Sequence, residues 1–130
     1  MSFQCVVVTP EQQAFEAQVT QVILPAHDGL MGILTDRAPL LVKLGVGPLR
    51  CDLPGNQKQH FLIDGGVAQM KDNKLTILTQ SATPSAEIDA EVARAAFAEA
   101  TARRATDPKS MAQRDHDLAK SRAAQALAGR

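Results

Sequence analysis

The chain has 130 residues, enough for one domain of ordinary size or for a small domain with an appendage. Its 14 basic and 14 acidic residues cancel, and its aromatic residues are four Phe with no Tyr or Trp. Neither a positive overall field nor an aromatic platform for stacked bases is present, which argues against a nucleic-acid-binding protein.

Short strands separated by turn residues are predicted for the first part of the chain. Residues 3–8 and 18–24 are β-rich runs, each ended by a proline. Asp28-Gly29 supplies a turn, residues 32–34 form a brief third strand, and Pro39 fixes a corner. Further strands are expected at residues 40–43, 46–53, 59–64, 67–70 and 75–79.

Three turn signals separate these later strands. Pro54-Gly55-Asn56 predicts a turn, and Gly65-Gly66 predicts a bulge or a close approach of two backbones. Asp72-Asn73 tolerates positive φ and therefore predicts a tight hairpin. Many short strands at this spacing are typical of an antiparallel sandwich or barrel rather than of a parallel α/β sheet.

The composition changes near Thr83-Pro84-Ser85, where sequence rich in Val, Leu and Ile gives way to sequence dominated by Ala, Arg, Glu and Lys. We therefore expect two domains, residues 1–84 and residues 85–130. In the second domain Ser85 can cap a first helix, which ends near Arg103-Arg104.

A second helix should begin at Asp107-Pro108 and run to about Ala128, with Gly129 past its end. Two Ala-rich helices joined by a short break are typical of a helical hairpin. Because alanine buries little apolar area, we expect this hairpin to be held only marginally and to be able to change partners.

Side chains that carry chemistry are not grouped along this sequence. His27, His60 and His116 lack the spacing of metal ligands, so no metal site is predicted. Cys5 and Cys51 both lie in predicted strands, where they could form a disulfide or be reduced core residues. The lack of an apolar signal segment at the start favours the reduced form. Neither a glycine phosphate cradle nor a carboxylate pair for acid–base chemistry is indicated.

Basic residues gather in the predicted hairpin. They are Arg94, Arg103, Arg104, Lys109, Arg114, Lys120 and Arg122. They are either a solvated face, balanced by neighbouring acidic residues, or a surface that docks against an acidic partner. Composition alone leaves both interpretations open.

Five fragments of the chain occur in an order and spacing that resemble the epsilon subunit of F-type ATP synthases. They are residues 23–25, 28–34, 38–41, 65–68 and 75–78, and the helical hairpin follows where that family has one. The resemblance covers essentially the whole chain. It implies a β-sandwich of about ten antiparallel strands followed by a C-terminal α-helical hairpin.

The same resemblance implies a non-catalytic rotor subunit of the central stalk. Such a subunit couples gamma to the c-ring during proton-driven ATP synthesis, and its C-terminal helices inhibit ATP hydrolysis by extending along gamma toward the alpha and beta subunits. No cofactor would be required. We expect the protein to lie on the cytoplasmic face of the bacterial inner membrane. Because no apolar run approaches the roughly 18 to 20 residues that span a bilayer, it would reach the membrane only through the complex.

Carried over residue by residue, the resemblance suggests two protein contacts. The loop at residues 29–32 would rest on the c-ring, and the rotor contact would comprise Gly29, Leu30, Met31, Gly32 and Arg37. Leu30 stands where many relatives have Glu, and Arg37 stands where His is usual. The residues that would meet acidic loops of the beta subunits are Arg103, Arg104, Lys109, Arg114, Lys120 and Arg122.

A nucleotide contact stays open. Some relatives bind ATP through an Ile/Leu-Asp-x-x-Arg-Ala motif at the start of the first helix. Arg94-Ala95 aligns with the end of that motif, but Ile88-Asp89 lies two residues too early, which is about 200° around a helix. Glu91 could stand in for the aspartate, so Glu91 and Arg94 are the residues through which the hairpin would contact ATP.

Two other classes of protein also stay open. The chain could be a free-standing β-sandwich binding module with a helical tail, which would form no stable complex with gamma. It could also be an enzyme of cupin-like type, which would hold a stoichiometric metal.

Overall fold

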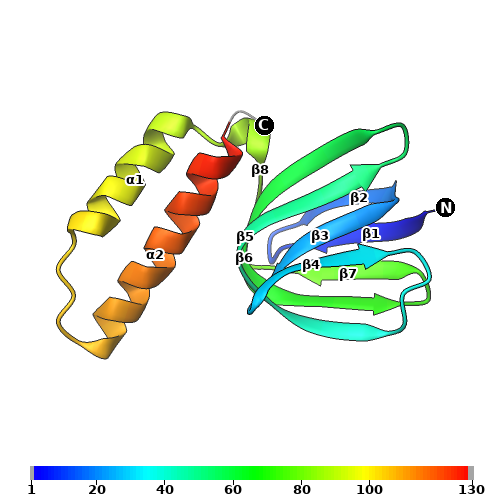
Figure 1. Cartoon of the computed structure of the whole chain (residues 1–130), viewed down its shortest axis with the longest axis horizontal. Coiled ribbons are helices and arrows are strands. Elements are labelled where there is room, and N and C mark those ends of the chain that lie inside the picture. Colours follow the sequence, from blue (N-terminus) through cyan, green and yellow to red (C-terminus); the bar gives the residue numbers. More distant parts are fainter. Residues whose placement is uncertain (1, 129–130) are drawn as a thin grey trace.

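Eight strands are followed by a 3-10 turn and two helices in the computed structural model, which describes residues 2–128 (Figure 1). The strands are β1 Phe3–Val8, β2 Gln13–Val19, β3 Gln21–Ala26, β4 Gly29–Leu34, β5 Leu40–Leu53, β6 Gln57–Lys71, β7 Lys74–Leu78 and β8 Ala82–Pro84. The turn is η1 Ser85–Glu87, and the helices are α1 Ala90–Ala102 and α2 Pro108–Leu127.

The two long strands, β5 and β6, pass through both layers of the sandwich. They pair antiparallel from Leu40↔Met70 to Leu53↔Gln57. One layer contains β4, β3, the second half of β5, the first half of β6, and β8. The other contains β2, β1, β7 and the remaining halves of β5 and β6. Figure 1 shows the two layers diverging from the β5–β6 pair.

Glycines lie where the long strands change layer. Gly65 and Gly66 have φ values of 70° and 107°, in a region that other residues rarely adopt. A Cβ atom on Gly66 would overlap the carbonyl oxygen of Leu78 and lie 2.9 Å from Thr79 Cα. The close backbone approach predicted at Gly65-Gly66 is therefore confirmed, and it lets β6 turn from one sheet into the other.

The predicted fold class, a β-sandwich followed by a helical hairpin, is confirmed. The structure has eight strands rather than about ten, and β5 and β6 are each continuous where the sequence predicted two separate strands. Within residues 2–128 one pair, β1 with β7, runs parallel, and the other pairings are antiparallel.

Two of the differences from the sequence-based expectation concern β2 and β3. β2 was missed because Gln13–Val19 contains few β-branched residues. Pro25 does not end β3, which runs on to Ala26. The pairing of β3 with β5 is irregular between Ile23 and Ala26, so the missing N–H of Pro25 interrupts a ladder that is already broken.

Side chains from β1 to β7 form the main core between the layers. The Phe15 ring of β2 meets the Phe61 ring of β6 edge to face at a centroid distance of 5.2 Å. Cys5 and Cys51 are fully buried free thiols, as predicted. A hydrogen bond with Cys5 and burial raise the pKa of the Cys51 thiol, so it stays protonated.

The hairpin begins after a different cap from the one predicted. Asp89, not Ser85, caps α1, because its carboxylate accepts hydrogen bonds from the backbone N–H groups of Glu91 and Val92. The start of α2 is confirmed, with Asp107 as the cap and Pro108 in the first turn. The helix ends at Leu127, and Gly129 lies outside the described residues. Within residues 2–128 no helix has the length and apolar character needed to cross a membrane.

In the folded chain, α2 lies between α1 and the sandwich (Figure 1). A second, smaller apolar cluster joins β6 to the hairpin. It contains Leu62, Ala93, Ala124 and Leu127, with Ile88 and Ala123 packed at its border. Among the described residues, Leu62 and Leu127 are the only large buried members of this cluster, so the apolar contact is thin, as the Ala-rich helices predicted.

Candidate functional site

Residues 29–32 are the first part of an edge strand, not a loop. β3 and β4 are joined by the two residues His27 and Asp28, and Ala26 pairs directly with Gly29. Gly29 has a φ of 138°, in a region that residues with a side chain rarely adopt, so glycine suits the first position of β4. The expected rotor loop is therefore replaced by a paired strand, because the turn closes before Gly29 rather than after it.

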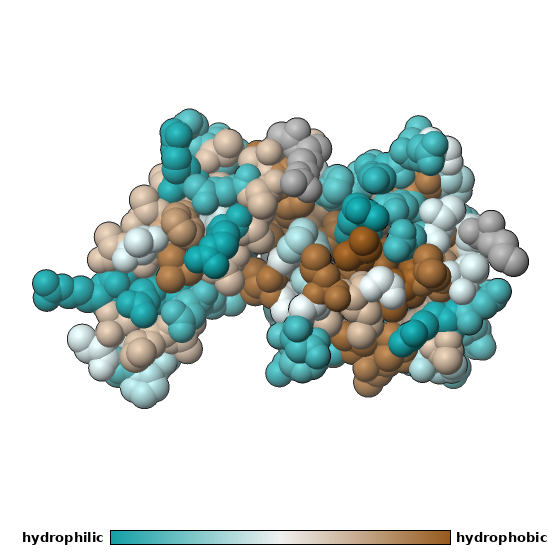
Figure 2. All heavy atoms as spheres, viewed as in Figure 1, coloured by the Kyte–Doolittle hydropathy of each residue, from teal (hydrophilic) through white to brown (hydrophobic). Residues whose placement is uncertain are grey.

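Alternation along β4 separates exposed from buried side chains. Leu30 and Leu34 are 65% and 57% exposed, whereas Ile33 is buried and Met31 packs partly against the main core. Leu41 of β5 is 71% exposed. Figure 2 shows hydrophobic residues gathered on the side of the sandwich turned to the viewer. A contiguous patch of exposed apolar side chains is typical of a surface that contacts another protein.

Arg37 does not join Gly29 and Leu30. It follows the far end of β4, and a strand of six residues at about 3.3 Å each separates the two positions. The turn before it is tied to the β6–β7 hairpin, because the Asp36 N–H donates to Asn73 Oδ1 at 2.8 Å and Asn73 Nδ2 donates to Asp36 Oδ1 at 2.9 Å. Arg37 and Gly29 therefore lie at opposite ends of one sandwich edge.

A charged cluster that the sequence analysis missed links the hairpin to the sandwich. Asp64 of β6 lies between two side chains of α2, with its Oδ1 2.9 Å from His116 Nε2 and its Oδ2 3.3 Å from Lys120 Nζ. His116 Nδ1 is 3.3 Å from Asp117 Oδ1. Arg103 of α1 then donates to Asp117 Oδ2 at 2.7 Å and also pairs with Glu99. The cluster thus runs from β6 through α2 to α1.

The ionisation of the cluster follows from these contacts. The hydrogen bond to Asp64 raises the pKa of His116, even though burial lowers it. Burial alone would raise the pKa of Asp64, but the hydrogen bonds and charges of His116 and Lys120 outweigh it and lower that pKa. The hydrogen bond from Arg103 lowers the pKa of Asp117. Asp64 and Asp117 are therefore carboxylates at neutral pH.

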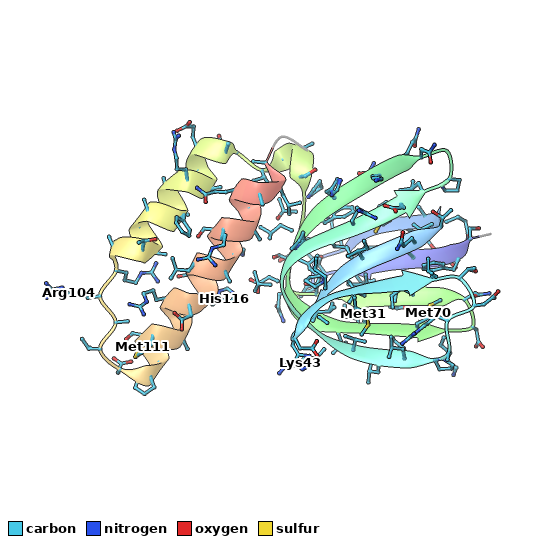
Figure 3. All side chains as sticks on the ribbon, viewed as in Figure 1. Met31, Lys43, Met70, Arg104, Met111 and His116 are labelled. Atoms are coloured by element: carbon cyan, nitrogen blue, oxygen red, sulfur yellow. The ribbon has the colours of Figure 1, made fainter. Side chains whose placement is uncertain are left out.

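The six proposed inhibitory cations fall into two groups, four that contact other side chains of this chain and two that are exposed near the connection between the helices. Arg103 and Lys120 are held by the charged cluster, and Arg122 lies over the Phe97 ring at 5.7 Å, within the hairpin. Arg114 is partly buried, with its Nε 3.9 Å from Asp115 Oδ1. Arg104 and Lys109 are exposed near the connection between the helices, and Figure 3 shows Arg104 at the edge farthest from the sandwich.

Glu91 and Arg94 are exposed on the first turns of α1, where they form an ion pair with each other. Asp89, the other acidic residue of the imperfect nucleotide motif, is used as the helix cap. Within residues 2–128 no three His, Cys, Asp or Glu side chains are grouped so that they could hold a metal ion.

Comparison with known proteins shows which family this chain belongs to. The sequence profile described as the ATP synthase delta/epsilon chain, beta-sandwich domain, matches residues 2–85. The ATP synthase epsilon chain of Synechocystis is 34% identical over 128 residues, which cover 95% of this chain and 93% of the relative. The chain belongs to the epsilon subunits of F-type ATP synthases.

Another epsilon chain agrees with this assignment, and a solved structure has the same fold. The chloroplastic epsilon chain of Emiliania huxleyi is 42% identical over 101 residues, covering 78% of this chain and 77% of the relative. A cryo-EM structure of the Euglena gracilis mitochondrial ATP synthase, described as OSCP/F1/c-ring in rotational state 1, contains a chain with the same fold. The TM-score is 0.87 at 24% identity, with 96% of this chain and 80% of that chain covered.

Proposed function

We propose that this epsilon subunit is a non-catalytic part of the rotor, which couples gamma to the c-ring and restrains ATP hydrolysis through its C-terminal helices. The observation that carries the proposal is the match to an epsilon chain along nearly the full length of both proteins, hairpin included. The subunit would lie peripherally on the cytoplasmic face of the bacterial inner membrane, held there by its complex.

The sandwich edge supports the rotor contact in this proposal. Leu30 and Leu41 expose most of their side chains, and neither is needed by the main core. We assign the β3–β4 hairpin with Gly29, Leu30 and Gly32 to the c-ring, and Met31 supports this strand from the core side. Arg37 then belongs to a separate rotor contact, because it lies at the other end of the edge.

The hairpin supports the inhibitory role because its contact with the sandwich is small. Burial of Leu62 and Leu127 contributes about 1.5 to 3 kcal/mol for each side chain, and the remaining members of this apolar cluster are mainly alanines. A docked state held by a few kcal/mol can exchange with another arrangement when a partner offers comparable contacts. In the extended state, Arg103 and Lys120 would exchange their carboxylate partners in this chain for acidic loops of the beta subunits.

Truncation after Ala86 tests the proposal. The main core contains residues of the sandwich alone, so residues 1–86 should fold without the hairpin. We expect the truncated protein to bind gamma as the full chain does but to lose inhibition of a reconstituted catalytic head. Equal inhibition by the two proteins would disprove the role of the hairpin, and failure of both to form a complex with gamma at micromolar concentration would disprove the rotor assignment.

A further inference from the structure

The contact between the hairpin and the sandwich has a polar part as well as an apolar one. Near the C-terminal end of α2, Leu127 is buried in the apolar cluster with Leu62. Nearer the middle of the helix, His116 and Lys120 both reach Asp64 on β6. Figure 3 shows His116 on the stretch of α2 between α1 and the sandwich. The polar part is the one whose strength can change with conditions.

Both ring nitrogens of His116 face carboxylate oxygens. Nε2 lies 2.9 Å from Asp64 Oδ1, and Nδ1 lies 3.3 Å from Asp117 Oδ1. A carboxylate only accepts hydrogen bonds, and a neutral imidazole has one N–H group. The imidazolium ion alone can donate to both partners, whereas the neutral ring would direct a lone pair at one of them. The observed geometry therefore fits protonated His116.

We propose that the contact of His116 with Asp64 is a proton-dependent latch, which holds the hairpin on the sandwich while His116 is protonated and weakens when the proton leaves. The proposal rests on the proposed function, since it assigns a regulating signal to the hairpin's movement. It concerns docking within the chain itself, which can be measured without a catalytic head.

The charges around His116 favour its protonated form. Three carboxylates belong to the cluster, Asp64, Asp117 and Glu99, against the two permanent cations Lys120 and Arg103. Protonated His116 balances the cluster, and neutral His116 leaves it with one excess negative charge. On β5, the other strand packed against α2, Arg50 is paired with Asp52 and Lys43 is exposed.

The direction of the pH effect follows from the two partners. The pKa of His116 is raised on docking, so its contribution is complete below its ordinary value of about 6.5 and is lost as the pH rises through the raised value. The pKa of Asp64 is lowered, so its contribution is lost only as the pH falls through that lowered value. Docking should therefore be strongest in mildly acidic solution and should weaken in alkaline solution.

Release of the latch would also expose a cation. Lys120 shares Asp64 with His116, and its side chain is already 41% exposed at the rim of the contact. When α2 leaves β6, Lys120 loses its carboxylate partner and becomes available to an acidic surface elsewhere. The same deprotonation would thus loosen the docked state and free a residue for the inhibitory one.

The full chain can be tested with spin labels on the exposed positions K58C of β6 and A112C of α2, since Cys5 and Cys51 are buried. The ratio of docked to undocked chains should fall between about pH 6 and pH 9. If docking raises the pKa of His116 by one, the ratio should fall about tenfold. His116→Gln should lower this ratio at pH 6 and remove its pH dependence. His27→Gln, a matched change in the exposed β3–β4 turn, should leave both unchanged.

Nuclear magnetic resonance of the ring protons gives a second measurement. The His116 ring should titrate at a higher pH in the unchanged chain than in the Asp64→Asn variant, because Asp64 raises the pKa of His116. A docked fraction that stays constant from pH 6 to pH 9, or that depends on pH equally in His116→Gln, would overturn the latch. Because no ATPase enters these measurements, loss of the inhibitory proposal would leave the result unaffected.

Discussion

Leu127, the last residue of α2, is buried in one cluster with Leu62 on the outer face of β6. Leu127 is 2% exposed and Leu62 6% exposed, and they are the only large side chains buried in this cluster as the structure describes it. In this contact with β6, a helix of 20 residues is thus held by one large apolar side chain at its end and by one charged cluster nearer its middle.

Leu127→Ala should release the hairpin without unfolding the sandwich. Truncation of a buried leucine costs about 2 to 5 kcal/mol, which is comparable with the whole apolar contact of α2 with β6. Amide hydrogen exchange should therefore become much faster along α2 and stay slow in β5 and β6. Met111→Ala, at a residue 45% exposed in the first turns of α2, is the control and should leave both patterns as they are.

Gly66→Ala should destabilise the sandwich by about 2 kcal/mol or more, because it combines a strained φ of 107° with an overlap against the Leu78 carbonyl. Gly65→Ala is the matched control, since its φ is 70° and nothing lies within 4 Å of the added methyl group. Urea denaturation compares the two. A smaller loss of stability in Gly66→Ala than in Gly65→Ala would show that β6 does not make this close approach.

Leu30→Asp should weaken assembly with the c-ring while leaving the fold intact, because the side chain is 65% exposed and outside the main core. The measurement is retention of the subunit on membranes that carry the complex, with thermal unfolding as the check on folding. Val92 of α1 is an equally exposed apolar residue, at 65%. The Val92→Asp subunit should stay on the membranes as the unchanged subunit does. Equal loss of both variants would point to a general effect of charge.

The double change Arg104→Ala and Lys109→Ala should weaken inhibition of ATP hydrolysis between about twofold and tenfold at low salt, with a smaller effect at high salt where such charges are screened. These two cations are exposed in the docked state, so their loss should not disturb the cluster around Asp64. Arg94→Ala removes a cation that is paired with Glu91 and serves as the control. An unchanged inhibition constant at low salt would mean that Arg104 and Lys109 belong to a solvent-exposed face and do not contact the catalytic head.

Local chemistry made several features predictable from the sequence. Asp72 and Asn73 adopt positive φ values of 53° and 57°, as a tight hairpin needs. Asp107 and Pro108 begin α2 with a cap and a residue suited to the first turn. These features depend on residues adjacent in the chain, and the same holds for the change in composition at Thr83-Pro84-Ser85, where the strands give way to helices.

Local chemistry also misled where two nearby residues competed. Ser85 and Asp89 are both good helix caps, and Ser85 is the one predicted from the sequence. The structure uses Asp89, whose carboxylate accepts two backbone hydrogen bonds, and Ser85 begins a 3-10 turn instead. Likewise, Gly29 was expected in a loop because its neighbours are turn residues, but its pairing with Ala26 makes it the first residue of β4.

The sequence by itself determined the sandwich, the hairpin and the resemblance to epsilon subunits, because strand periodicity, turn residues and helix caps act over a few neighbouring positions. Only the tertiary structure decided which charges meet. Asp64 and His116 are 52 residues apart, and Arg103 and Asp117 belong to different helices. Nothing in the spacing of these residues indicates a contact, since their separation in space is set by how α2 packs on β6.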